Sequence, residues 1–358
     1  MSHNASMRIV HVLWSLGRGG AERFVLDLAC EQEKRHEVRV IAVCGGEMEQ
    51  QFHDADIELT VLGKQPRTFA ERFAVVEQCK TLFKQWQPDI VHTHLGADVW
   101  AGYFAARPLK IPWVMTAHSH EPDLGFITRM LRFFAYRGTR AVAAVSASVR
   151  DMAMWRYGVS EKRVTVIPVG IRLDRFEQRE RHQAGDIPKL VVVGRLSPEK
   201  GHAVLFEALA QLRRPWFLTI VGDGPMRLML QRESERLGIA PRLRWAGSVS
   251  DPSYFLTTAD VFCLPSLHEG QGIALLEAAA SRLPAIASDL PAVREVFDRR
   301  SMVTVTPGDA TALAQAIHQT LTQYTDALDR ADIASTIVRK RFGIDTVAEA
   351  YDSLYQSL

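Results

Sequence analysis

ADVFCLPSLHEGQGIALLEAAASRLPAIASD, residues 259–289, indicates the fold class of this chain. Two short runs, 259–266 and 284–289, flank a segment of helix length, and each run is apolar on both faces of an extended strand. Strands buried on both faces are typical of parallel sheets, in which neighbouring strands are joined by a crossover helix. The stretch therefore predicts a β-strand, an α-helix and a second β-strand parallel to the first.

The same alternation continues in both directions along the chain. Apolar, β-branched runs separated by amphipathic stretches occur at 7–14, 37–43, 57–62, 89–94, 113–118, 141–146, 164–170, 189–196, 216–224, 243–249, 259–266, 284–289 and 302–308. This pattern predicts an α/β protein with a doubly wound parallel sheet, and the series of strands occurs twice.

A polar, charged segment near 170–188 separates the two series of strands. The chain has 358 residues, about twice the length of a typical domain. We therefore expect two Rossmann-like domains, 1–170 and 171–341. Ligands bind at the carboxyl ends of the strands in such sheets, so the expected active site is a cleft between the two domains.

Composition and charge exclude several classes of protein. The formal net charge is only +2, which gives no reason to expect nucleic acid as a partner, although residues 101–170 carry 10 basic and 4 acidic side chains. The four cysteines are scattered and are expected to be buried thiols in a reducing compartment. No apolar run approaches the ~20 residues that span a bilayer, and the polar start MSHNASM is unlike a signal peptide. We expect a cytoplasmic protein.

Three glycines follow the first predicted strand. Gly17, Gly19 and Gly20 stand between this strand and a helix, where glycine lets backbone N–H groups approach a ligand. A dinucleotide-binding GxGxxG motif would need glycine at position 22, which is Glu22. An NAD site is therefore disfavoured, and the glycines fit a tight turn and a ligand loop equally well.

Three histidines lie at or near predicted strand ends. A metal trio of His92, His94 and His118 is conceivable, but we expect His92 and His94 to project to opposite faces of their strand, so no metal site is predicted. His118, in TAHSH, stands at a strand terminus where it can hydrogen-bond a ligand hydroxyl or a transition-state oxygen. A purely structural histidine fits this position equally well.

The first strand of the second series ends in VVVGRLSPEKGH, 191–202. Arg195 and Lys200 lie in the turn before a helix, where a guanidinium, an ammonium and a helix N-terminus together suit a pyrophosphate. Such cations can stabilise a departing diphosphate without a metal. Gly222, in GDGP after the next strand, offers another turn that a ligand can approach closely.

The loop and helix after residue 265 give the strongest signal. Glu269 precedes the turn Gly270–Gln271–Gly272–Ile273 and Glu277 lies in the following helix, eight residues from Glu269. Both carboxylates can face one site, where each can accept hydrogen bonds from neighbouring hydroxyls of a ribose or a sugar ring. The N–H groups of the Gly270–Ile273 turn suit a phosphate.

Together these motifs resemble glycosyltransferase family 4, a family of retaining enzymes with the GT-B fold. The resemblance covers nearly the whole chain and rests on GRGGAER (17–23), DIVHTH (89–94), TAHS (116–119), VSAS (145–148), VIPVGI (166–171), GRLSPEKG (194–201), GDGP (222–225) and HEGQGIALLEA (268–278). It implies a final helix, 342–358, that packs back on the N-terminal domain.

The resemblance also implies a role for each candidate residue. Arg195 and Lys200 bind the donor diphosphate, Glu277 binds the ribose, and Glu269 with the adjacent turn holds the donor sugar. His118 reaches this sugar from the other domain, Gly19–Gly20 lies against phosphate or acceptor, and Ser248 and Val249 pair with the base. Two positions depart from the family pattern: Gln271 replaces a large apolar residue, and Val169 replaces the asparagine common before Gly170.

The reaction implied is glycosyl transfer from a nucleoside diphosphate sugar, with UDP favoured, and with retained anomeric configuration and no metal. The acceptor is a glycan or a lipid-linked glycan of a cell-surface polysaccharide or glycolipid. An epimerase of the same architecture and a non-catalytic nucleotide-sugar-binding protein stay as alternatives.

Two basic, aromatic segments raise the question of a membrane. FITRMLRFFAYRGTR, 126–140, carries four arginines beside large apolar side chains, and 69–86 adds a second set. Such segments can lie on an anionic membrane. A helix packed on the sheet with solvated arginines explains the pattern slightly better, so peripheral membrane contact stays open.

Overall fold

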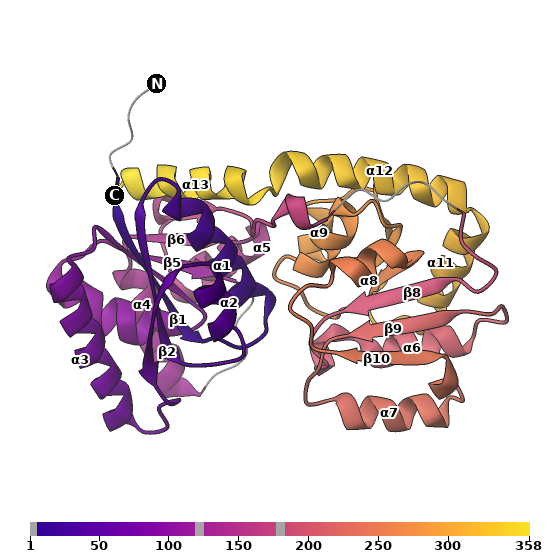
Figure 1. Ribbon diagram of the computed structural model, residues 1–358, viewed down its shortest axis with the longest axis horizontal. Helices are drawn as coiled ribbons and strands as arrows, with labels where there is room; N and C mark the ends of the chain where they lie inside the picture. The colour runs from indigo at the N-terminus through magenta and orange to yellow at the C-terminus, as the bar shows by residue number, and fades with distance from the viewer. Residues whose placement is uncertain (1–5, 119–124, 177–182) are drawn as a thin grey trace. The chain divides into compact units, whose positions relative to one another are not determined.

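The computed structural model describes residues 6–118, 125–176 and 183–358 (Figure 1). The chain divides into two compact units, one of residues 1–170 with 344–358 and one of residues 171–343. Each unit is a parallel sheet covered by helices, and the N-terminal sheet has seven strands where the C-terminal sheet has six. The predicted fold class, two doubly wound Rossmann-like units, is confirmed.

The N-terminal unit is built on the strand order β3-β2-β1-β4-β5-β6-β7. Its strands are β1 (Arg8–Ser15), β2 (Glu37–Cys44), β3 (Glu58–Gly63), β4 (Ile90–His94), β5 (Trp113–Ala117), β6 (Ala141–Ala144) and β7 (Val164–Val166). Its α-helices are α1 (Gly20–Glu33), α2 (Glu49–Asp54), α3 (Phe69–Trp86), α4 (Phe126–Gly138), α5 (Ala147–Tyr157) and α13 (Ile344–Gln356), with a π-helix at Asp98–Ala106.

The C-terminal unit has the strand order β10-β9-β8-β11-β12-β13. Its strands are β8 (Lys189–Val193), β9 (Phe217–Val221), β10 (Leu243–Gly247), β11 (Val261–Leu264), β12 (Ala285–Ser288) and β13 (Val303–Val305). Its α-helices are α6 (His202–Ala210), α7 (Arg227–Arg236), α8 (Ser253–Thr258), α9 (Ile273–Ala280), α10 (Pro291–Arg294), α11 (Ala310–Thr322) and α12 (Tyr324–Arg341).

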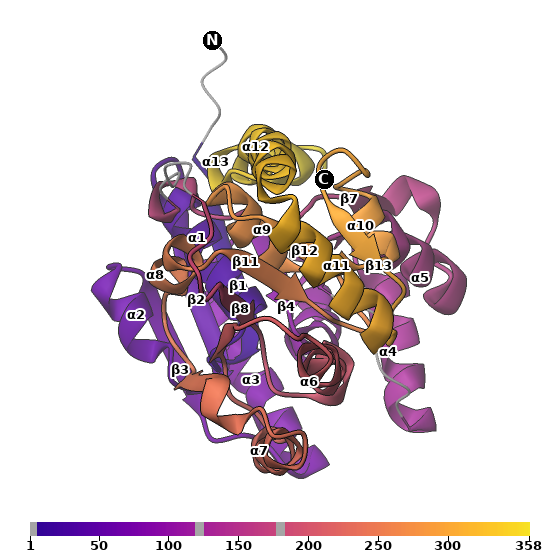
Figure 2. The ribbon, with the colours of Figure 1, turned by 90° about the vertical axis from the view of Figure 1, so that its right-hand side faces the viewer.

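Alternation along the strands explains why helices cover both faces of the C-terminal sheet. Leu190 and Val192 of β8 pack with α6 and α11 in one buried cluster, whereas Val191 packs with α9 and α12 in another. Figure 2 shows α6 and α11 together against this sheet. Successive side chains of a strand point to opposite faces, so a strand with two apolar faces requires this double cover.

The last helix of the chain belongs to the N-terminal unit. Helix α13 packs against α1 (Figure 1). Its Tyr351 and Tyr355 are buried. At the start of α13 the backbone comes close to Gly170: a Cβ there would lie 3.0 Å from the Cα atom of Ile344. Glycine at 170 therefore allows the close approach of these two segments.

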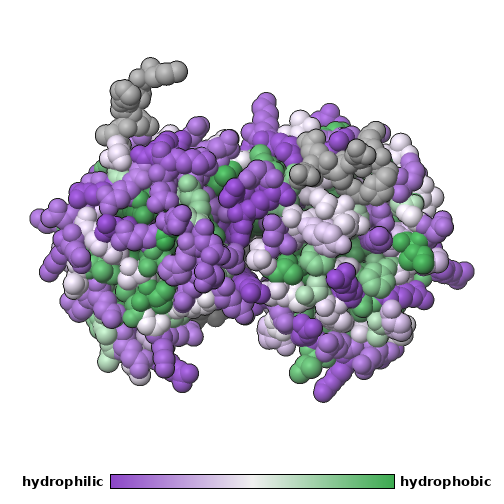
Figure 3. Space-filling view, viewed as in Figure 1, coloured by the Kyte–Doolittle hydropathy of each residue, from purple (hydrophilic) through white to green (hydrophobic). Residues whose placement is uncertain are grey.

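Apolar side chains are not confined to the cores. On the face shown in Figure 3 the N-terminal unit is mostly hydrophilic, with patches of apolar residues between the hydrophilic ones. Of the four cysteines, Cys44, Cys79 and Cys263 are buried and Cys30 is half-buried. Within the described residues no helix is long and apolar enough to cross a bilayer.

Candidate active site

The candidate site of the C-terminal unit lies at the carboxyl ends of β8 and β11. These two strands are neighbours, but the chain leaves β8 towards β9 on one side and β11 towards β12 on the other. The loops after two such strands diverge and leave a crevice, where ligands bind in open α/β sheets. The loop after β8 carries Arg195 and Lys200, and the loop after β11 carries Glu269.

Lys200 and Glu269 contact each other directly. The Lys200 ammonium lies 2.7 Å from a carboxylate oxygen of Glu269, and the Ser266 hydroxyl donates to the same oxygen at 2.7 Å. The Glu269 side chain is only 7% exposed, against 26% for Lys200. A carboxylate with this little solvent needs such partners, because an unpaired buried charge is costly. Sixty-nine positions of sequence separate two groups that the fold joins.

Glycine at position 201 makes the approach of the two loops possible. Its φ is +64°, and a Cβ atom would stand 2.0 Å from the carbonyl oxygen of Pro265. The backbone N–H of Leu267 also donates to the carbonyl of Glu199 at 2.8 Å. The two loops are therefore joined by backbone packing as well as by the ion pair.

A second carboxylate, Glu199, lies beside the cations of the first loop. Burial alone would raise its pKa, but the Ser197 hydroxyl at 2.5 Å, its own backbone N–H and the charges of Lys200 and Arg195 lower the pKa overall. Arg195 itself is exposed. An anionic ligand at this edge would meet an exposed guanidinium and an ammonium already shared with a carboxylate.

The turn before α9 contains a glycine in a left-handed backbone conformation. Gly272 precedes the helix with φ +79°, a conformation that favours glycine, and Ile273 is the first helical residue. Gln271 is buried, and Glu277 is half-buried in the second turn of α9. The carboxylate of Glu277 thus lies on a short helix whose N-terminus opens at the same sheet edge as Glu269.

The remaining candidates of this unit follow β9 and β10. A Cβ at Gly222 would stand 1.9 Å from the Gly194 carbonyl oxygen, so the loop after β9 touches the loop after β8. Ser248 and Val249 directly follow β10, the edge strand, and both are half-buried. They lie at the same carboxyl edge, two strands away from β8.

In the N-terminal unit, the glycine turn after β1 leads into α1. Gly19 is the residue before the helix and Gly20 is its first residue. A Cβ at Gly19 would lie 2.2 Å from a carboxylate oxygen of Glu22, so this carboxylate lies against the first turn. Helix N-termini stabilise negative charge, and an anion bound here would share that field with Glu22.

The prediction for the histidines of the N-terminal unit is wrong. His92 and His94 do not project to opposite faces: residues two apart in a strand share one face, and their rings lie 4.0 Å apart between centroids. A third histidine, His11 of β1, pairs in register with His92. The sequence reasoning missed His11, although it lies in the first apolar run, MRIVHVLW (7–14), as His92 and His94 lie in DIVHTH (89–94).

Each ring of this cluster is hydrogen-bonded. Candidate ligand atoms of His11, His92 and His94 lie within 4.8 Å of one another, which is a spacing that a metal ion could use. His92, however, contacts the hydroxyls of Tyr355 at 2.6 Å and Thr116 at 2.7 Å. His94 lies between His11 at 3.1 Å and His118 at 3.2 Å.

His118 ends this row of histidines, immediately after β5. Burial lowers its pKa to about 4, so the ring is neutral at pH 7. One nitrogen contacts His94, and the other, Nδ1, is buried without a hydrogen-bond partner among the described residues. A buried polar atom without a partner costs free energy, which marks Nδ1 as a place for a ligand group.

Comparison with known proteins identifies the family. A family model described as Glycosyltransferase Family 4 matches residues 18–175, and one described as Glycosyl transferases group 1 matches residues 174–336. The two models together take in nearly all of both sheets. The chain belongs to glycosyltransferase family 4. Its activity class is therefore glycosyl transfer.

Individual relatives of this family 4 glycosyltransferase are distant. A glycogen synthase of Mycobacterium tuberculosis is 29% identical over 76% of this chain and 69% of its own length. A UDP-Gal:alpha-D-GlcNAc-diphosphoundecaprenol alpha-1,3-galactosyltransferase of Escherichia coli is 28% identical over 58% of this chain and 60% of its own. The structure of Anabaena Alr3699/HepE in complex with UDP-glucose shares the fold, with a TM-score of 0.86, 20% identity and coverage of 98% and 100%.

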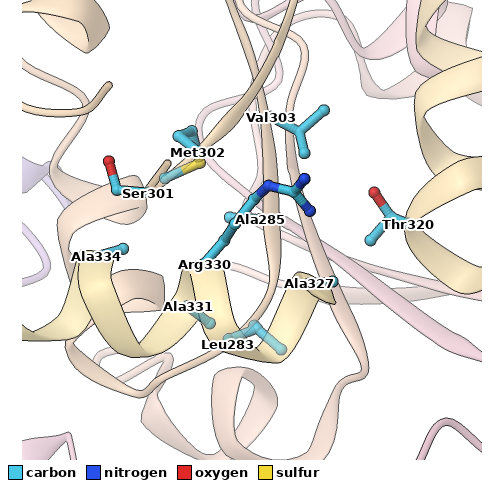
Figure 4. A pocket seen from close by; sticks show the side chains of 10 residues that line it. All are labelled: Leu283, Ala285, Ser301, Met302, Val303, Thr320, Ala327, Arg330, Ala331 and Ala334. Carbon is cyan, nitrogen blue, oxygen red and sulfur yellow. The ribbon is translucent and has the colours of Figure 1, made fainter. Parts of the chain in front are cut away.

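A separate small pocket in the C-terminal unit of the glycosyltransferase does not coincide with the candidate residues. Figure 4 shows its lining, which includes Leu283 and Ala285 before and in β12 and Met302 and Val303 at the start of β13. These positions lie at the amino ends of the strands. Ligands of open α/β sheets bind at the carboxyl ends instead, so the candidate active site stays at Lys200 and Glu269.

Proposed function

We propose that this glycosyltransferase moves a sugar from a nucleoside diphosphate sugar, with UDP favoured, to a glycan or lipid-linked glycan acceptor. The observation that carries the proposal is the contact of Lys200 with Glu269 at the carboxyl edge of the C-terminal sheet. Lys200, a cation suited to phosphate, and Glu269, a carboxylate suited to sugar hydroxyls, are there joined directly by a hydrogen bond. The products would serve a cell-surface polysaccharide or glycolipid, as the name of the Escherichia coli relative suggests for that enzyme.

The C-terminal unit is proposed to bind the donor. Arg195 is exposed and is proposed to turn towards the diphosphate, while Lys200 shares its charge between the diphosphate and Glu269. As the bond to the sugar breaks, negative charge grows on the leaving phosphate, and the two cations stabilise it. This division of roles needs no metal ion, and we propose a metal-independent enzyme.

The other parts of the donor are proposed to be bound by carboxylates and backbone N–H groups near these cations. Glu277 accepts hydrogen bonds from the ribose hydroxyls, and Glu269 accepts one from the sugar. The Gly270–Ile273 turn offers N–H groups to phosphate because glycine at 272 leaves the helix N-terminus open. Ser248 and Val249, after β10, are proposed to meet the base.

The N-terminal unit is proposed to bind the acceptor and to contribute His118 to the reaction. The carboxylate pairs used by retaining hydrolases include a nucleophile, and no described carboxylate beside His118 is suited to this role. We therefore propose front-face attack with retention, in which the leaving phosphate helps to deprotonate the acceptor.

Binding and turnover of donors test the proposal. A panel of nucleotide sugars should raise the midpoint of thermal unfolding for one donor, because a ligand that binds only the native state stabilises it by mass action. With that donor, release of nucleotide should depend on the acceptor, and NMR of the product should show the retained anomer. Interconversion of the donor sugar without an acceptor would favour an epimerase, and binding without turnover would favour a non-catalytic protein.

Helix α4 suggests where an anionic membrane could be met. Its Phe126, Ile127 and Phe134 are 70%, 56% and 46% exposed, and the helix also carries Arg129 and Arg137. Exposed apolar side chains beside arginines suit the interface of an anionic bilayer. We propose that the enzyme works at the inner face of the cytoplasmic membrane when its acceptor is lipid-linked.

Liposome co-sedimentation tests this part. Vesicles with phosphatidylglycerol should retain the protein at low salt and release part of it at high salt. The variant Phe126→Ser/Ile127→Ser should bind less, while Trp155→Ser, which removes another exposed ring (86%) on α5, should bind as the parent does. Equal binding by both variants would contradict a role for α4.

A further inference from the structure

A continuous row of buried hydrogen bonds crosses the N-terminal unit and ends at His118. Asp352 of α13 contacts Gln32 of α1 at 3.0 Å, and Gln32 contacts His11 of β1 at 2.9 Å. His11 contacts His94 of β4 at 3.1 Å, and His94 contacts His118 at 3.2 Å. Gln32, His11, His94 and Asp352 are each less than 6% exposed. The row is thus shielded from water until it reaches its last ring.

Asp352 determines which partner donates in each hydrogen bond of the row. Its carboxylate forms an ion pair with Arg35 at 3.0 Å and lies 3.3 Å from Nε2 of His36. An ionised carboxylate only accepts hydrogen bonds. Gln32 must therefore present its NH₂ group to Asp352 and its carbonyl oxygen to His11.

The carbonyl oxygen of Gln32 determines the tautomer of His11, and each ring then determines the tautomer of the next. His11 donates Nε2–H to Gln32, and a neutral imidazole with one proton must accept at its other nitrogen. His94 consequently donates Nε2–H to Nδ1 of His11 and accepts at its own Nδ1. His118 then donates Nε2–H to His94, and its Nδ1 keeps a lone pair. Burial lowers the pKa of all three rings, which keeps each ring neutral.

We propose that Asp352 and Gln32, acting through His11 and His94, hold His118 in the Nε2–H tautomer, so that its Nδ1 accepts a hydrogen bond from a hydroxyl of the sugar substrate. The inference deepens the proposed function and rests on it for the identity of the ligand. Asp352, Gln32, His11 and His94 are positioning residues, since none of them is the group that meets the ligand. The consequence is selective: a hydroxyl can donate to Nδ1, whereas a phosphate oxygen at the same place would face a lone pair.

A second set of contacts supplies a matched control. His92 contacts Tyr355 and Thr116, and Thr116 contacts the Tyr351 hydroxyl at 3.0 Å. Tyr351 lies on α13 as Asp352 does and is equally buried. Its hydroxyl contacts Thr116 and, within the described residues, forms no hydrogen bond with a member of the row. Tyr351→Phe therefore removes a buried hydroxyl from the same helix without removing a link between Asp352 and His118.

Nitrogen-15 NMR of the full-length protein with labelled histidine tests the tautomer directly. In the unaltered protein, Nε2 of His11, His94 and His118 should each carry the proton. Gln32→Leu should release His118 into a mixture of tautomers, and Tyr351→Phe should leave the tautomer of His118 unchanged. A proton on Nδ1 of His118 in the unaltered protein would overturn the proposal, and so would zinc that stays bound through dialysis at His11 and His94.

Kinetics then test the ligand. Gln32→Leu should lower kcat/KM by up to about tenfold, the order of one hydrogen bond, while the affinity for the nucleoside diphosphate alone stays unchanged. With the deoxy-sugar that lacks the contacted hydroxyl, Gln32→Leu should cause no further loss. If Gln32→Leu lowers kcat/KM by the same factor with every deoxy-sugar as with the normal sugar, the proposed contact with a hydroxyl is wrong. A correct tautomer in an enzyme indifferent to His118→Ala would instead refute the proposed role of His118 and leave the row intact.

Discussion

At the scale of single residues, the contact of Lys200 with Glu269 is the main observation that supports the proposed donor site. The carboxylate of Glu269 is nearly buried and accepts from both an ammonium and the Ser266 hydroxyl. The pair is therefore part of the stability of the loops as well as the proposed donor site.

Lys200→Met should abolish most activity and also destabilise the protein. It keeps the apolar stem but leaves Glu269 without its cation, so the free energy of unfolding should fall by about 1–3 kcal/mol. Urea unfolding measures this loss. Arg227→Met is the control, because its pair with Asp223 is half-exposed and surface pairs contribute about 0–1 kcal/mol. Equal losses in the two variants would show that Glu269 does not depend on Lys200.

At the scale of elements, two loops and a short helix create the site edge. Gly201, at the end of the loop after β8, has both a positive φ and a backbone oxygen where a Cβ would stand. Gly238, after α7, has a similar φ of +69° but nothing within 4 Å of a Cβ. Substituting Gly201 and Gly238 therefore distinguishes the cost of a strained φ from the cost of pushing the two loops apart.

Gly238→Ala should cost about 1 kcal/mol through its φ alone and leave the rate of transfer unchanged. Gly201→Ala should cost more in unfolding free energy and also lose most activity, because the loops carrying Lys200 and Glu269 must move apart. Denaturation and donor turnover, measured on both variants, decide the matter. Full activity in Gly201→Ala would show that loop contact is unimportant to the site.

At the scale of the whole molecule, buried neutral histidines make stability depend on pH. Burial lowers the pKa of His11, His118 and His202 from 6.5 to about 4. As pH falls below about 6.5 the unfolded chain takes up protons that the native protein refuses. The free energy of unfolding should therefore be constant above pH 6.5 and fall towards pH 4, by about 1.4 kcal/mol per pH unit for each histidine.

His202 offers the cleanest check, because it lies in the C-terminal unit and both ring nitrogens are buried with no hydrogen-bond partner among the described residues. His202→Leu should flatten the decline between pH 6.5 and pH 4 by about one proton. Urea titrations at several pH values give the slope. His53→Leu, an exposed histidine of α2, should keep the slope of the parent. An unchanged slope in His202→Leu would mean that this ring is already charged in the native state.

The sequence by itself determined the strands and the ends at which the candidate residues gather. All thirteen apolar runs form strands of the described sheets. A strand that is buried on both faces consists almost entirely of apolar residues, so it can be recognised from a short stretch of sequence. The motifs around Lys200, Glu269 and His118 were equally visible, since glycine turns and charged residues after strands are local features. The relation of His92 to His94 was local too, and was misjudged.

Only the tertiary structure decided what those groups touch. The 2.7 Å contact of Lys200 with Glu269 joins loops after two strands that become neighbours through sheet order. Asp352 reaches Gln32 across 320 positions because the last helix returns to the N-terminal unit. Periodicity reports which face of an element is buried, whereas strand order and helix return are set by packing over the whole unit, and no short stretch of sequence records them.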